Sequence, residues 1–108
     1  MNIQIFGRPK SFDSKKAERW FKERRIRYQY TDLGRYGMSR GELKSVAASV
    51  GTDNMIDWSN PNAAILKYLA SADAKLDKLY ECPEFILAPI VRNGKNATAG
   101  YMPDVWKN

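Results

Sequence analysis

The chain has 108 residues, a length that suits one domain, and 44% of them are hydrophobic, which is enough to form a core. It contains no histidine and a single cysteine, Cys82, so an intrachain disulfide, a Ser-His-Asp triad and a histidine-containing zinc site are excluded. The net charge of +6 favours anionic partners such as phosphates, oxyanions, thiolate-bearing peptides or nucleic acid, but a basic surface that only keeps the protein soluble explains it equally well.

The first third of the chain has the pattern of a strand, a helix and a second strand. Residues 3–6 predict a short strand, which Gly7 and Pro9 end. A helix is expected over about residues 14–25, because apolar residues recur there at the spacing of one helical face. Residues 27–32 alternate as a second strand should. This order predicts a βαβ unit, with two parallel strands joined by a right-handed crossover.

The middle of the chain, about residues 38–88, is predicted to be helical and to form an insertion. Ser39 fits the N-cap of a capping box, Pro61 fits the first position of a second helix, and Ser71 caps a third. The apolar face of the second helix is assigned to Ile65, Leu66 and Leu69. We expect this segment to cover one side of a small sheet.

The last part of the chain predicts two short strands and a final helix. The strands are expected at residues 89–92 and 96–99, with Asn93–Gly94 as a two-residue hairpin turn, since both residues tolerate positive φ. The helix is expected over 103–107. The whole order, β-α-β, then helices, then β-β-α, predicts one α/β domain over residues 1–108 with a small mixed sheet.

The loop from Gly7 to Lys16 is the best candidate for a functional site. It joins the first strand to the first helix, and open α/β sheets bind ligands at the carboxyl ends of their strands. Free N–H groups and the positive end of the helix dipole favour an anion there. Four basic residues add charge: Arg8, Lys10, Lys15 and Lys16. The alternative is structural, in which Ser11, Asp13 or Ser14 caps the helix and the lysines are only solvated.

Three blocks of sequence, the first of them in two parts, resemble the arsenate reductase/Spx (ArsC-like) family. Residues 3–7 (IQIFG) and 10–17 (KSFDSKKA) resemble its active-site segment, and residues 89–95 (PIVRNGK) and 99–106 (AGYMPDVW) resemble its closing segments. The order and spacing of the blocks agree, so the resemblance covers essentially the whole chain. It implies a thioredoxin-like fold with a helical insertion, and a cis Ala88–Pro89 bond beside the loop.

The chain departs from this family at the residues that carry its chemistry. The family's nucleophilic cysteine maps onto Ser11, and the second cysteine of Spx-like members maps onto Ser14. A serine hydroxyl is too weak an acid to ionise in this environment, and no histidine is present to act as a base. We therefore expect the chain to be inactive as written. Ser11 is either natural to a repurposed member or a substitution of the cysteine.

The arginines that the resemblance implies for oxyanion binding are also missing. Their positions hold Ala88 and Tyr101, and Arg92 could compensate only in part. Arsenate reduction is therefore not expected, even with a cysteine at position 11. Ser11 takes the catalytic position, and the residues assigned to substrate or anion binding are Arg8, Lys10, Phe12, Asp13, Ser14, Lys15, Ala88, Pro89 and Arg92. Cys82 is expected to fill space in the core, and we expect no metal.

Two functions are open at this point. The resemblance implies a thiol-dependent oxidoreductase that handles glutathione or protein thiols, with no covalently bound cofactor. The alternative is a non-catalytic or transcription-regulatory module of the Spx type, with an RNA-polymerase-type partner. Direct nucleic-acid binding rests on net charge alone, because the chain has no zinc-finger, RRM or KH signature. With no apolar run near the roughly 20 residues that cross a bilayer, and no signal peptide, we expect a cytoplasmic monomer without a membrane partner.

Overall fold

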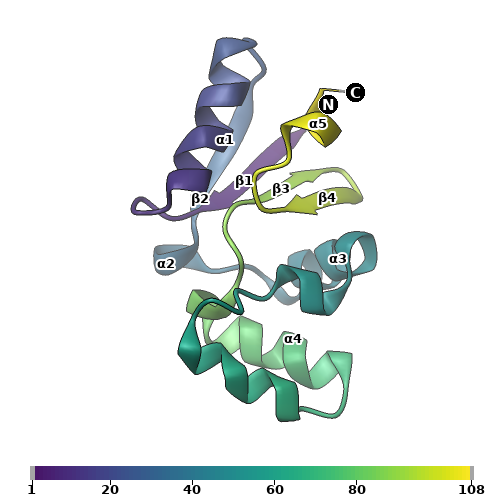
Figure 1. Ribbon diagram of the computed structural model, residues 1–108. Helices are drawn as coiled ribbons and strands as arrows, with labels where there is room; N and C mark the ends of the chain where they lie inside the picture. The colour runs from purple at the N-terminus through teal and green to yellow at the C-terminus, as the bar shows by residue number, and fades with distance from the viewer. Residues whose placement is uncertain (1, 108) are drawn as a thin grey trace.

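The computed structural model describes residues 2–107, and its elements follow the predicted order (Figure 1). The strands are β1 (Ile3–Gly7), β2 (Tyr28–Asp32), β3 (Ile90–Asn93) and β4 (Asn96–Ala99). They form one mixed sheet in the order β2-β1-β3-β4, in which β1 is parallel to β2 and antiparallel to β3, and β3 is antiparallel to β4. The α/β class and the parallel pairing of the first two strands are confirmed.

A helix connects β1 to β2, several helices lie between β2 and β3, and one follows β4. The α-helices are α1 (Phe12–Glu23), α2 (Leu33–Tyr36), α3 (Arg40–Val50), α4 (Ala72–Glu81) and α5 (Pro103–Trp106). Three stretches are 3₁₀ helices: η1 (Thr52–Met55), η2 (Pro61–Tyr68) and η3 (Pro83–Phe85). The predicted capping box is present at the start of α3, and Ser71 caps α4 as expected. None of the helices described for residues 2–107 has the length and apolarity that crossing a bilayer requires.

The two faces of the sheet carry cores of different size. Alternation along β1 and β3 sends Phe6 and Ile90 to one face, where they meet buried residues of the helical segment. Ile3, Ile5 and Val91 lie on the other face against α1. Figure 1 shows α1 alongside β1 and β2, with α3 and α4 on the other side of the molecule. The larger core therefore fixes the helical segment to the sheet, and the smaller one holds α1 and α5.

The hairpin turn is one residue later than predicted. Asn93 pairs with Asn96, so the central residues of the turn are Gly94 and Lys95 rather than Asn93 and Gly94. Gly94 has a φ of 63°, and Lys95 is not among the residues with positive φ. A glycine with positive φ at the first central position is typical of a type II′ turn, which suits the twist of a two-residue hairpin.

Three helix predictions also need correction. The first helix begins at Phe12 rather than near residue 14, because Ser11 is its N-cap. Residues 33–36, to which the sequence assigns no helix, form α2, since the Asp32 carboxylate accepts the Gly34 N–H and caps them. In η2, Ile65 is 52% exposed while Leu66 is fully buried. A 3₁₀ helix turns every three residues, so it cannot bury the two neighbours that an α-helical face would.

Candidate functional site

The loop between β1 and α1 lies beside the segment that enters β3. Phe6 pairs with Ile90, which brings Pro89 next to Gly7 at the carboxyl end of β1. The Pro89 carbonyl oxygen accepts the Gly100 N–H at 2.8 Å, and this bond fixes the chain after β4 to the same place. The Ala88–Pro89 bond is cis, as the resemblance implies. Segments from three parts of the sequence therefore meet at this corner of the sheet.

Ser11 caps the first helix from inside this corner. Its hydroxyl oxygen accepts the Ser14 N–H at 3.1 Å, and its own N–H donates to the Arg8 carbonyl oxygen at 3.1 Å. The side chain is half-buried and has extended backbone angles, as N-cap residues do. Of the alternatives for the cap, Ser11 takes this role, and its oxygen sits at the positive end of the α1 dipole.

Gly7 and Ser14 are in close contact where the loop joins β1 to α1. Ser14 is 1% exposed, and its hydroxyl oxygen accepts the Arg8 N–H at 3.2 Å. A Cβ atom at position 7 would lie 2.8 Å from the Ser14 Oγ and 3.1 Å from Cε2 of Tyr30. Only glycine fits this approach of strand to helix. Ser14 thus holds the strand-to-helix corner together, and its hydroxyl does not face a ligand.

Arg8 turns away from the helix end and reaches the segment after α4. Its guanidinium donates to the Pro83 carbonyl oxygen at 2.6 Å. Burial lowers the pKa of Arg8 from its usual range, and the carboxylates of Asp57, Glu84 and Asp32 partly offset that effect. The guanidinium stays charged at neutral pH. Arg8 therefore ties the loop to the helical segment instead of presenting a free cation at Ser11.

The remaining loop residues are exposed. Phe12 is 79% exposed at the first position of α1. Asp13 in the first turn of α1, Lys10 and Lys15 are exposed as well. Next along the helix, the Lys16 ammonium lies 5.7 Å from the ring centroid of Tyr101. Tyr101 occupies a position for which the resemblance implies an arginine. The exposed positive charge of the site is therefore carried by lysines in contact with solvent.

Arg92 lies apart from the loop. It sits on β3 opposite Gln4, and its guanidinium donates to the Gln4 Oε1 at 2.9 Å and to the Ser45 Oγ at 3.3 Å. These contacts lie on the face of the sheet that α3 covers. The structure thus brings Ser11, Ala88 and Pro89 to one corner, and it directs the Arg92 side chain to a different place.

Several solved structures resemble this arrangement. An ArsC-family-related protein from Bacteroides fragilis is 18% identical, over 99% of this chain and 96% of that one, with a TM-score of 0.87. An arsenate reductase from Vibrio cholerae is 22% identical, over 97% and 94%, with a TM-score of 0.81. The glutaredoxin-like NrdH-redoxin from Escherichia coli, described as having a thioredoxin-like activity profile, is 16% identical over 99% and 92%, with a TM-score of 0.53. The chain has a thioredoxin-like fold.

These likenesses establish the fold alone, since all three identities are low. No protein-family model matches the sequence, and no curated protein does. Within the thioredoxin-like fold, the predicted loop occupies the corner between the first strand and the first helix.

Sequence reasoning missed two partners of the loop in this thioredoxin-like fold. Tyr30 packs against Gly7, and burial raises its pKa above the usual range, with Glu18 adding to the effect. Its alternation with Tyr28 along the second predicted strand could have indicated this face. Pro83, whose carbonyl accepts from Arg8, has no such signal, because a contact across 75 residues leaves no local pattern.

The groups that this corner presents include no thiol, because the only cysteine of the sequence, Cys82, lies elsewhere. Ser11 has no histidine to deprotonate it, and Cys82 lies at the end of α4, half-buried, where it packs against the larger core. Within residues 2–107, no group of three or more carboxylate, cysteine or histidine side chains could hold a metal ion. The corner offers a helix N-terminus, exposed lysines and the peptide group before β3.

Proposed function

We propose that the chain is an arsenate-reductase/Spx-like protein that binds a thiol-containing ligand at the Gly7–Lys16 loop without exchanging disulfides there. The ligand class is glutathione or a cysteine-bearing protein segment. The observation that carries the proposal is the position of Ser11, which caps α1 just after β1, while the register of β1 and β3 places Pro89 next to Gly7. A cysteine at this place would be held as thiolate by the helix end, whereas the serine hydroxyl stays neutral.

The polar groups around the loop support an organic ligand over an inorganic oxyanion. Arg8 is bonded to Pro83, and Arg92 is bonded to Gln4 and Ser45, so neither guanidinium is directed at Ser11. Lysines remain, which attract the carboxylates of glutathione as point charges but lack the bidentate geometry with which an arginine would hold an arsenate. Arsenate is therefore not part of the proposal.

The peptide group of Ala88 supplies the second element of recognition. Ala88 precedes β3 and lies outside the ladder that joins β3 to β1 and β4. An extended ligand that pairs with this peptide would run past Ser11 and Phe12, whose ring is exposed for an apolar contact. Backbone pairing gives affinity to such a ligand whatever its side chains, and its cysteine would face the Ser11 hydroxyl.

An NMR titration of the full chain with reduced glutathione tests this proposal. We expect amide shifts confined to residues 7–16 and 88–92 at millimolar ligand. The double variant Lys10→Gln/Lys15→Gln should weaken binding several-fold, because both cations lie at the loop. Lys44→Gln, an exposed lysine on α3, is the matched control and should change nothing. If no signal shifts at millimolar glutathione, the small-thiol version of the proposal is wrong.

A second candidate is a regulatory module that binds a protein, and the distribution of charge favours it. Residues 1–36 hold ten Lys and Arg against four Asp and Glu, and residues 37–108 hold eight of each, so the whole net charge of +6 lies in the first third. An acidic surface on a partner such as RNA polymerase would meet this region. A cytoplasmic location and a monomeric state, expected from the sequence, belong to both candidates.

Binding to purified RNA polymerase, measured by sedimentation, distinguishes the second candidate. Arg19→Glu, an exposed charge reversal on α1, should weaken that binding, and Lys67→Glu on η2 should not. Co-sedimentation that is absent, or equally sensitive to both variants, removes this candidate.

A further inference from the structure

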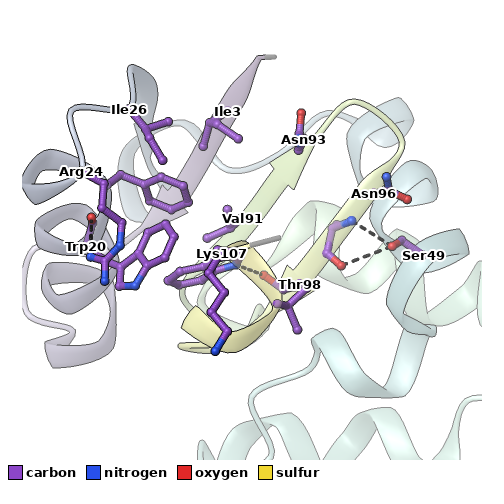
Figure 2. A pocket seen from close by; sticks show the side chains of 14 residues that line it. Ile3, Trp20, Arg24, Ile26, Ser49, Val91, Asn93, Asn96, Thr98 and Lys107 are labelled. Carbon is purple, nitrogen blue, oxygen red and sulfur yellow. Dashed lines mark hydrogen bonds between the residues drawn. The ribbon is translucent and has the colours of Figure 1, made fainter.

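A cavity of about 550 Å³ lies at the opposite end of the sheet from the loop. It is bounded by α1, by α5 and by the β3–β4 hairpin, and it includes Ile3, the first residue of β1 (Figure 2). The loop begins at Gly7, four residues along the same strand, which is roughly 13 Å away at the rise of a β-strand. The volume is within the range of about 300–1,000 Å³ that small-molecule sites occupy.

The inner surface of the cavity is aromatic and aliphatic. Trp20 and Phe21 line it from α1, Val91 from β3 and Trp106 from α5. Trp20, Phe21 and Val91 are all less than 7% exposed, so the cavity reaches down to the smaller core. Surfaces of this kind bind flat rings or short aliphatic chains by excluding water.

The aromatic wall is held in place before any ligand arrives. The Trp106 indole N–H donates to the Thr98 Oγ1 at 2.7 Å. Its ring centroid lies 5.6 Å from that of Trp20 and 5.2 Å from that of Phe21. A wall fixed by a hydrogen bond and two ring contacts loses little further freedom when a ligand binds, and affinity rises accordingly.

Two cations and no carboxylate lie among the described residues that line the cavity. The Arg24 guanidinium stacks 4.0 Å from the ring centroid of Trp20 and donates one bond, of 3.2 Å, to the Trp20 carbonyl oxygen. Its planar group has five N–H donors, so further donors remain for a ligand. Lys107 is exposed, and its ammonium lies 3.7 Å from the Asp104 carboxylate in a solvated pair. Figure 2 shows Arg24 beside Trp20, and Lys107 between Trp20 and Thr98.

We propose that this cavity is a binding site for a small amphipathic organic anion. Its ring or short chain lies against Val91 and Trp106, and its carboxylate or sulfonate contacts Arg24, with Lys107 nearby. The apolar wall selects against inorganic anions, and the cations select against neutral apolar molecules of the same shape. The site is separate from the loop, so it stands whether or not the loop binds a thiol.

The test uses anilinonaphthalene sulfonate as the anionic probe and phenylnaphthylamine as a neutral counterpart of similar shape, each titrated into the full chain. The three tryptophan indole N–H signals report the place of binding by NMR. Signals of Trp20 and Trp106 should shift, while that of Trp58, whose indole N–H donates to the Asp53 carbonyl oxygen at 3.0 Å, should stay in place. The anion should bind more tightly than the neutral probe.

Variants separate charge from shape. Arg24→Gln/Lys107→Gln should weaken the anionic probe about three- to ten-fold and leave the neutral probe unchanged. Arg24→Lys, which keeps the charge, should lose less than Arg24→Gln. The matched control is Arg19→Gln, an exposed cation on α1 outside the cavity, and it should have no effect. The proposal is overturned if the Trp20 and Trp106 signals do not move, if both probes bind equally, or if Arg19→Gln weakens the anion as much as the double variant.

Discussion

The two ends of β1 differ in how fully the chain satisfies its own groups. At the Gly7 end, the hydroxyls of Ser11 and Ser14 and the guanidinium of Arg8 each have a partner within the chain. At the Ile3 end, a cavity of about 550 Å³ stays open beside Arg24. The end that carries the motif is thus tightly bonded and offers a ligand only its exposed surface, whereas the end without any motif has a cavity.

The difference follows from what each end packs against. Gly7 lets α1 approach the strand so closely that no further atom fits, and the helical segment covers this corner through Pro83. At the other end the cover is α5, a single turn with no buried residue. Resemblance of sequence therefore points to the Gly7 end, whereas local packing leaves a cavity at the Ile3 end.

The largest effect on stability is expected from adding an atom at the tightly packed Gly7 end of β1, the closed end; the Ile3 end, beside the cavity, is the open end. Gly7→Ala places a Cβ atom 2.8 Å from the Ser14 Oγ and 2.9 Å from the Ser14 Cβ, and both are buried between strand and helix. Overpacking of this kind lowers the free energy of unfolding by about 1–3 kcal/mol. Denaturant unfolding measures it. The matched control is Gly41→Ala on α3, where nothing lies within 4 Å of the new atom, so stability should stay the same or rise.

A gain of thiol chemistry at the closed end is the next largest effect. Ser11→Cys, made with Cys82→Ser so that one thiol remains, should have a pKa lowered to about 7.5 or below, because the sulfur would occupy the N-cap of α1. Against an ordinary cysteine pKa of about 8.5, this gives roughly ten-fold more thiolate at neutral pH. The rate of alkylation against pH reports the value, with the unaltered chain and its Cys82 as the reference. A pKa near 8.5 would contradict the assignment of the helix end as the site.

The order of elements could be predicted because its signals are local. A capping box at Ser39 and a proline at the start of η2 are each read within four residues of sequence. The turn at Gly94–Lys95 was misplaced because cross-strand pairing of Asn93 with Asn96 decides it, and pairing is not local. Leu66 is buried as predicted, but the exposure of Ile65 depends on a 3₁₀ geometry that hydrophobic spacing alone does not reveal.

The candidate site could also be predicted only in part, where its signals are local. That Ser11, Asp13 or Ser14 would cap a helix here followed from the local sequence, and the cis bond at Pro89 followed from the family resemblance. The partners of Arg8 and Arg92 could not be predicted, because they are distant in the sequence. Pro83 lies 75 residues from Arg8, and Gln4 lies 88 residues from Arg92. The cavity has no motif at all, because it results from the shortness of α5 rather than from any residue type.

A smaller effect concerns the bond that fastens α1 to β2 at the open end. The Tyr28 hydroxyl donates to the Glu18 Oε1 at 2.9 Å, and burial together with this bond raises the pKa of Tyr28 to about 12. The folded-state value lies above the ordinary 10, so the stability it contributes is complete below about pH 10 and is lost as the pH rises through 12. Ultraviolet absorbance of the tyrosinate should show this late titration step.

Tyr28→Phe removes that step and lowers the free energy of unfolding at neutral pH by about 0.5–1 kcal/mol, the range of a partly exposed hydrogen bond. Tyr68→Phe, at a tyrosine that is 86% exposed, is the control and should leave the late step in place. A titration of Tyr28 near pH 10 would mean that the bond to Glu18 does not hold the proton.

The smallest change in stability is expected from adding atoms at the open end. Val105 on α5 is 51% exposed and lines the cavity, so Val105→Phe adds several carbon atoms where there is space for them. The free energy of unfolding should change by no more than about 0.5 kcal/mol, although Gly7→Ala adds one carbon and costs more. The same variant should weaken the anionic probe, because the new ring occupies part of its volume. A loss of stability equal to that of Gly7→Ala would show that the two ends are packed alike, and the contrast between them would fail.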